Sequence, residues 1–165
     1  MSHNSLIAQW SNFNVAMTGS SAALAGPVIV AASVNIGTII RVGTLTARLA
    51  AAVAALVLTL VVSAAGLIPG ISSVAYGLVI LIAAAGAGVF QAHAAWIMLR
   101  DPDQSQRDRI SKAALGFVPV AAYLVSGVMM VSSHPTGLIL AAAGGILAIV
   151  SGILVSWIVL VEVLR

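Results

Sequence analysis

The residues best placed to do chemistry form a polar stripe in the first long apolar segment of the chain. Steps of seven from Asn14, with the residues midway between them, mark one face of a helix at 3.5-residue spacing. The stripe is polar at both ends and small and apolar in the middle: Asn14, Thr18, Ser21, Ala25, Val28, Ala32 and Asn35. Amides and hydroxyls inside a membrane hydrogen-bond a neighbouring helix or hold water in a pore. The stripe therefore predicts either a channel lining or a helix–helix seam.

In the channel interpretation, copies of this helix from several subunits surround a central axis. Val28, with Ala25 and Ala32, would form a hydrophobic constriction that gates by dewetting. No charged residue lies in the middle of an apolar segment, and Arg41 would stand at the inner mouth. Without a ring of charges, selectivity would be weak. The sequence thus predicts a homo-oligomeric, weakly selective channel for ion transport.

In the alternative interpretation, the same stripe is a binding seam. The protein would then be an accessory or regulatory subunit that docks on another membrane protein, such as a membrane protease. Gly19, Gly26 and Ser33 run beside the stripe and permit close approach of a helix. Gly26 and Pro27 also predict a bend or hinge, because proline removes one helical hydrogen bond.

Two more polar residues, Gln91 and His93, fall within the third apolar segment. Intramembrane polar residues are functional candidates by default, although a hydrogen bond to a neighbouring helix explains each more simply. Their separation of two residues places them on nearly opposite sides of a helix. A single histidine at this depth and the lack of cysteine exclude a bis-histidine haem within one chain.

The rest of the chain offers no set of residues typical of an enzyme. We find no paired carboxylates, no Ser/His/Asp set, no phosphate loop and no cluster of metal ligands. We therefore expect no enzymatic activity, no cofactor and no metal. The net charge of +3 resides in the loops and predicts no nucleic-acid partner.

The amino-acid composition indicates that these residues lie in a lipid membrane. Of the 165 residues, 61% are hydrophobic and 7% are charged, whereas soluble domains carry about 25% charged residues. Five apolar runs are each long enough to cross a bilayer, which takes about 20 residues. We expect them at about 15–40, 47–68, 73–99, 110–131 and 136–164. Runs of this length with short loops predict one transmembrane domain, 1–165, an all-α bundle of five transmembrane helices.

The basic residues predict how the bundle is oriented. All seven fall in the segments after the first and third helices or at the C-terminal end, and none falls in the other connections. Because cytoplasmic loops are enriched in lysine and arginine, we expect the N-terminus outside and the C-terminus inside.

One stretch resembles a known family. The run from Trp10 to Ile36, WSNFNVAMTGSSAALAGPVIVAASVNI, is similar to the start of a family of small, uncharacterised bacterial multi-span membrane proteins. VVSAAGLIPG, residues 61–70, resembles the second span of that family and its turn. Some members are labelled as modulators of a membrane AAA protease. The resemblance implies a bacterial cytoplasmic membrane and a protein partner within it.

A fainter likeness concerns the first helix alone. SSAALAGPVIVAASV, residues 20–34, is similar to the pore-lining first helix of Orai calcium channels. Orai channels have four spans, and their selectivity glutamate would fall at Val34. This departure removes the calcium site, so the likeness implies a pore without implying calcium selectivity.

Overall fold

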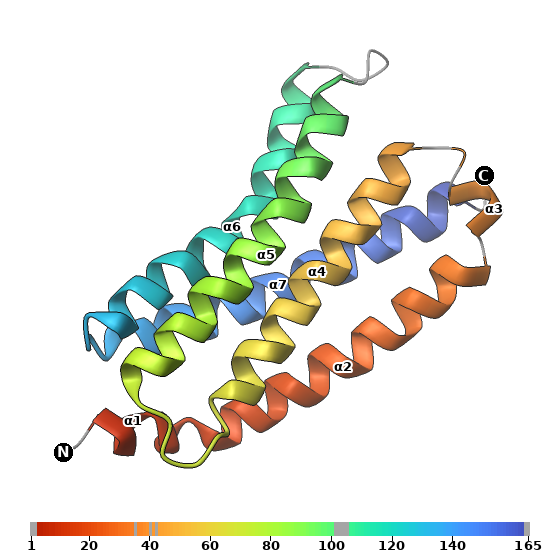
Figure 1. The fold of residues 1–165 in the computed structure, drawn as a ribbon. Helices are drawn as coiled ribbons and strands as arrows, with labels where there is room; N and C mark the ends of the chain where they lie inside the picture. The colour runs from red at the N-terminus through yellow and green to blue at the C-terminus, as the bar shows by residue number, and fades with distance from the viewer. Residues whose placement is uncertain (1–2, 35, 40, 42, 101–105, 164–165) are drawn as a thin grey trace.

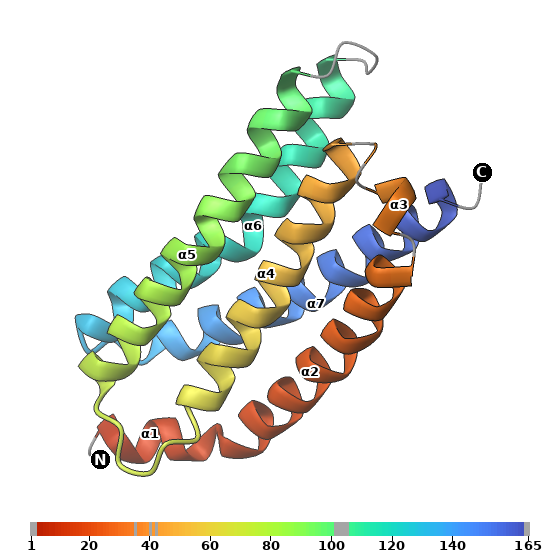
Figure 2. The ribbon, with the colours of Figure 1, turned by 45° about the vertical axis from the view of Figure 1, so that its right-hand side comes forward.

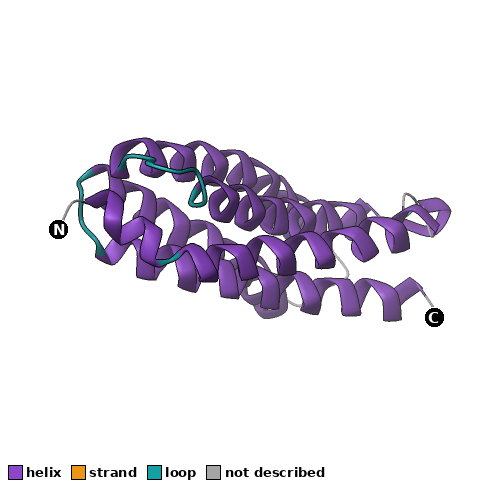
Figure 3. Cartoon of the chain, turned by 90° about the horizontal axis from the view of Figure 1, so that it is seen from below, coloured by secondary structure: helices purple, strands orange, loops and turns teal. Residues whose placement is uncertain are grey.

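A computed structural model describes residues 3–34, 36–39, 41, 43–100 and 106–163. Its described elements are all helices, joined by short turns (Figures 1 and 3). In chain order they are α1 (His3–Gln9), α2 (Ser11–Val34), α3 (Ile36–Ile39), α4 (Gly43–Ala65), α5 (Ser73–Arg100), α6 (Gln106–Val131) and α7 (Thr136–Val163).

Four of these helices contain apolar stretches long enough to span a bilayer, and a fifth is apolar over a shorter stretch. The long stretches are Ser11–Val34, Gly43–Ala65, Ser73–Ile97 and Thr136–Trp157, and the shorter one is Gly116–Val131. At 1.5 Å per residue, the shortest of the four long stretches measures about 33 Å, enough for a hydrocarbon core of about 30 Å. The prediction of an all-helical, multi-pass membrane protein is confirmed at this level. The orientation stays a prediction.

The first helix differs from the expected segment. We expected one helix from 15 to 40, but α2 begins at Ser11 and ends at Val34, and the short α3 follows at Ile36–Ile39. Asn35, one of the predicted stripe residues, lies outside the described residues.

The most central helix is α4. Figures 1 and 2 show α4 between α2 and α5, with α7 behind it, and α6 lying along α5. Half of the apolar stretch of α4 is buried, compared with 17% of that of α2. The helix with the polar stripe is therefore peripheral, and α4 organises the bundle.

The turns arise from residues that stop or start helices. After α4, Gly70 takes a positive φ of 72°, which glycine adopts without steric cost. The hydroxyl of Ser72 then accepts a hydrogen bond from the amide of Ala75 at 3.2 Å, capping the start of α5. Between α6 and α7, Ser133 has a φ of 59° and the amide of His134 donates to the carbonyl of Met129. These turns reverse the chain within a few residues, so consecutive helices pack antiparallel.

The two ends of the bundle are packed differently. The main core lies towards the N-terminal end, around Tyr76, Ile80 and Tyr123. The opposite end holds a much smaller cluster of alanines, Ala47, Ala51 and Ala94. Small side chains fill less space between diverging helices. The bundle is therefore more open on the side where α2 meets α3.

Candidate functional site

The predicted stripe faces the inside of its own bundle. Asn14, Ser21 and Val28 are 5%, 0% and 9% exposed, and Thr18, Ala25 and Ala32 are half-buried. The Asn14 amide lies against Gly66 at the end of α4, where a methyl group would overlap it. One turn along α2, the Met17 methyl lies 2.8 Å from where a Cβ on Gly145 of α7 would be. From Asn14 to Val28 the stripe therefore lies on the side of α2 that packs on α4 and α7, whereas Ala32 lies farther along, in a groove lined also by α4 and α5.

This seam depends on packing more than on hydrogen bonds between helices. The Thr18 hydroxyl donates to the carbonyl of Asn14 at 2.8 Å, and the Ser21 hydroxyl to that of Met17 at 2.6 Å. Both bonds stay within α2. The amide nitrogen of Asn14 is buried and finds no partner among the described residues.

The other face of α2 carries the predicted hinge. Gly26 and Pro27 are exposed, and α2 continues through both as one helix. Nothing in the described structure lies within 4 Å of where a Cβ on Gly19 or Gly26 would be. A hinge at Gly26 and Pro27 stays a prediction. Arg41 is exposed in the turn between α3 and α4.

Gln91 and His93 lie on different faces of α5. Gln91 is 6% exposed and packs against Gly116 of α6, at a point where any side chain would collide with it. His93 is exposed and stacks on Trp96, with ring centroids 6.2 Å apart. Gln91 therefore belongs to the contact between α5 and α6, and His93 faces the surroundings of the bundle.

The structure adds a polar contact that the sequence analysis missed. The hydroxyl of Tyr123 in α6 donates to the hydroxyl of Thr59 in α4 at 3.3 Å, and Thr59 in turn donates to the carbonyl of Ala55 at 3.1 Å. Tyr123 and Thr59 are both buried. They are 64 residues apart, and no local pattern in the sequence pairs them. This chain of hydrogen bonds links two helices deep in the bundle.

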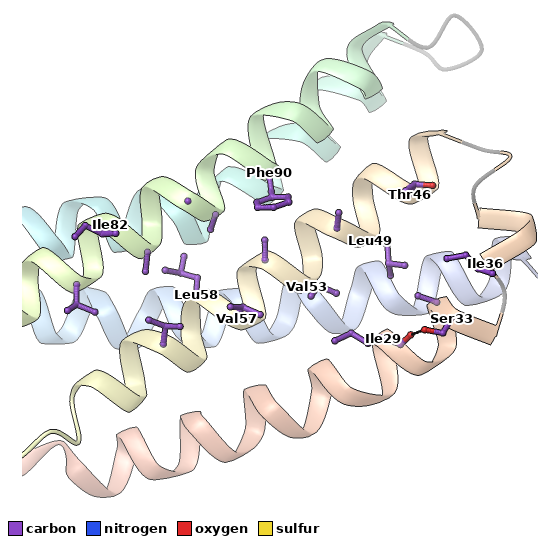
Figure 4. A pocket seen from close by; sticks show the side chains of 18 residues that line it. Ile29, Ser33, Ile36, Thr46, Leu49, Val53, Val57, Leu58, Ile82 and Phe90 are labelled. Atoms are coloured by element: carbon purple, nitrogen blue, oxygen red, sulfur yellow. Dashed lines mark hydrogen bonds between the residues drawn. The ribbon is translucent and has the colours of Figure 1, made fainter.

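A long groove of about 800 Å³ runs between three helices, and we call it the α2/α4/α5 groove. Its volume falls within the range of small-molecule sites, about 300–1,000 Å³. Figure 4 shows α4 as its floor and α2 and α5 as its two walls. Typical lining residues are Ile29 and Ser33 from α2, Val53 and Val57 from α4, and Ile82 and Phe90 from α5. None of the described residues that line it is charged.

Polarity changes along the groove. Ser33 and Thr46 line it at the end near α3, whereas Leu58 and Ile82 line it farther along (Figure 4). The Ser33 hydroxyl donates to the Ile29 carbonyl at 2.8 Å, so it is satisfied within its own helix. From Thr46 to Val61, the floor covers 16 residues of α4, and the distance between these two ends is about 22 Å. The lining is therefore apolar along most of its length, with two hydroxyl-bearing side chains, Ser33 and Thr46, near the α3 end.

The residues that form the groove carry no motif that distinguishes them in the sequence. In α4 and α5 apolar residues lie on every side, and the polar part of the stripe on α2 does not line the groove, so the pattern does not show which faces meet. The one local signal is the set of small residues that face the groove, such as Ala50, Ala83 and Gly86.

Comparisons with known proteins found no match for this chain among family models, curated proteins and solved structures. The similarity of the first 70 residues to small bacterial membrane proteins thus stays a prediction, as does the likeness of α2 to the Orai pore helix. The geometry of the chain itself carries the functional argument.

Proposed function

We propose that this protein is a non-enzymatic, lipid-binding accessory protein of the membrane, and that the α2/α4/α5 groove is its binding surface. This proposal differs from both functions expected from the sequence, a channel lined by the stripe and a subunit that binds another membrane protein through the stripe. The ligand is now a lipid, and the binding surface is the groove. The observation that carries the proposal is the apolar lining of the groove along the span, with polar residues at one end.

The choice of a lipid as the ligand of the groove follows from the bilayer that surrounds the protein. A groove within the spans contacts lipid, and the hydrophobic effect excludes water from an apolar surface of this length. An acyl chain continues the hydrocarbon of the bilayer into the groove. The polar end at Ser33 and Thr46 and the apolar remainder match the order of groups in an amphiphile.

The burial of the stripe argues against the interpretation of α2 as a channel lining. A channel lined by α2 needs Asn14 and Ser21 on an axis between copies, and in one chain these side chains are covered by α4 and α7. To line a pore, α2 would have to detach from Gly66 and Gly145. The binding interpretation requires no such rearrangement.

Photolabelling in liposomes tests the proposal. A phospholipid with a diazirine on its acyl chain is reconstituted with the protein, activated by light, and its adducts are mapped by mass spectrometry. We expect adducts concentrated in segments 29–36, 46–61 and 79–90. Ala50→Leu and Gly86→Leu fill the groove and should each reduce these adducts several-fold.

The matched control is Ala85→Leu, next to Gly86 on the same helix. Ala85 is exposed and does not line the groove. This variant should label like the wild type. Adducts spread evenly over all lipid-facing positions, and unchanged by Ala50→Leu and Gly86→Leu, would contradict the proposal.

A further inference from the structure

One charged residue stands at the polar end of the groove. Arg41 lies in the turn between α3 and α4, and the flanking segments supply Ile36 and Thr46 to the lining. Figure 4 shows Ile36 and Thr46 at the same end of the groove. Arg41 is exposed, and it is the only charged residue in the first 47 of the chain. A guanidinium group at this point is suited to a phosphate group, which it can bind with two parallel hydrogen bonds.

The surrounding charge has the same sign. The turn with Arg41, the C-terminal end of α5 and the N-terminal end of α6 lie at one end of the bundle (Figures 1 and 2). The segment 100–112 carries four basic residues, Arg100, Arg107, Arg109 and Lys112, and three acidic ones, Asp101, Asp103 and Asp108, so its net charge is +1. Basic residues at a membrane surface attract anionic lipids. A lipid whose head group lies at this end therefore meets a positive field.

The length of the groove relates the position of Arg41 to that of a bound acyl chain. The floor extends about 22 Å from Thr46, whereas one leaflet contributes about half of a 30 Å hydrocarbon core. An acyl chain that starts beside Thr46 therefore stays within the groove over the full depth of its leaflet. Its head group then lies at the turn that contains Arg41.

We infer that the α2/α4/α5 groove selects an anionic glycerophospholipid, with its phosphate group at Arg41 and an acyl chain along α4. This inference rests on the proposed function and adds the class of lipid and the residue that recognises it. The positive charge of Arg41 discriminates between head groups, and the apolar walls bind the chain irrespective of the head group.

Native mass spectrometry of the full-length protein in detergent tests the inference. Phosphatidylglycerol and phosphatidylcholine with identical acyl chains compete for the protein, and inorganic phosphate is a third arm. We expect the wild type to prefer phosphatidylglycerol. Because one basic residue near an anionic surface contributes roughly a factor of five, Arg41→Gln should reduce that preference about five-fold. Inorganic phosphate should not compete, since it has no acyl chain.

Lys112→Gln is the matched control, because it removes the same charge at the same end of the bundle but from α6. Lys112 contributes to the surrounding positive charge and not to the proposed phosphate contact, so Lys112→Gln should reduce the preference clearly less than Arg41→Gln does. Equal binding of both lipids by the wild type, or equal losses in Arg41→Gln and Lys112→Gln, would overturn the inference.

The two levels of the proposal fail in different ways. If Gly86→Leu abolishes binding of both lipids while Arg41→Gln changes nothing, the groove binds lipid and only the role of Arg41 is wrong. If Gly86→Leu does not change the binding of either lipid, the groove is not the lipid site and both proposals are wrong. The same conclusion follows if two copies of the protein form a dimer that covers the groove and keeps lipid out.

Discussion

The amide of Asn14 lies against the bare α-carbon of Gly66, so closely that a methyl group on Gly66 would overlap it. This contact fixes the start of the polar stripe to the end of α4. A side chain at Gly66 must therefore push α2 away from the bundle or move the Asn14 amide.

Gly66→Ala is expected to destabilise the protein. Overpacking of a filled interior costs about 1–3 kcal/mol, and equilibrium unfolding in mixed detergent micelles measures the loss. Gly86→Ala is the control, because nothing lies within 4 Å of where its Cβ would be. Alanine is the better helix former by about 1 kcal/mol, so Gly86→Ala should leave stability unchanged or raise it. Equal destabilisation by both substitutions would show that Asn14 does not pack on Gly66.

The hydrogen bond from Tyr123 to Thr59 predicts a measurable coupling between α6 and α4. Tyr123→Phe and Thr59→Val each remove one hydroxyl and keep most of the shape of the side chain. Polar contacts between membrane helices average about 0.6 kcal/mol in double-mutant cycles. We expect a coupling free energy of unfolding of this size from the two single variants and the double variant. Strict additivity of the two losses would mean that the hydroxyls do not interact.

Much of the architecture could be predicted from the sequence, because few structures satisfy backbone groups in hydrocarbon. A run such as 73–99 is long enough to span and has no partner strands, so it forms a helix. Pro69 and Gly70 mark a turn for the same local reasons in sequence and in structure. The position of these features depends only on nearby residues.

The faces of the helices were harder to predict. In soluble helices a polar side identifies the surface, but α5 is apolar all round, and its inward residues, such as Ile80 and Ala84, look like its outward ones. The stripe from Asn14 to Val28 was recognisable as one face of a helix. What this face meets depends on Gly66 and Gly145, which lie far along the chain.

There is a further reason why the groove could not be predicted from local sequence patterns. The groove exists because α2, α4 and α5 diverge on one side, and divergence depends on the packing of the whole bundle. Arg41 was expected at the mouth of a pore, and in the structure it lies in the turn between α3 and α4, whose flanking segments supply Ile36 and Thr46 to the groove.

The central claim is that the stripe is buried within one chain and that the protein works through its lipid-facing groove. Two neighbouring serines of α2 test this claim most directly. Ser21 is fully buried, whereas Ser20 is exposed. The chain has no cysteine, so Ser21→Cys and Ser20→Cys each introduce a single thiol with little change in size. The measurement is the rate of thiol modification in liposomes by a charged, water-soluble reagent and by an apolar, membrane-soluble one.

We expect the thiol of Ser21→Cys to react with neither reagent and that of Ser20→Cys to react with the apolar reagent alone. Modification of Ser21→Cys by the charged reagent, at a higher rate than Ser20→Cys, would place Ser21 on a water-filled path. That result would contradict the binding account and support a channel lined by α2.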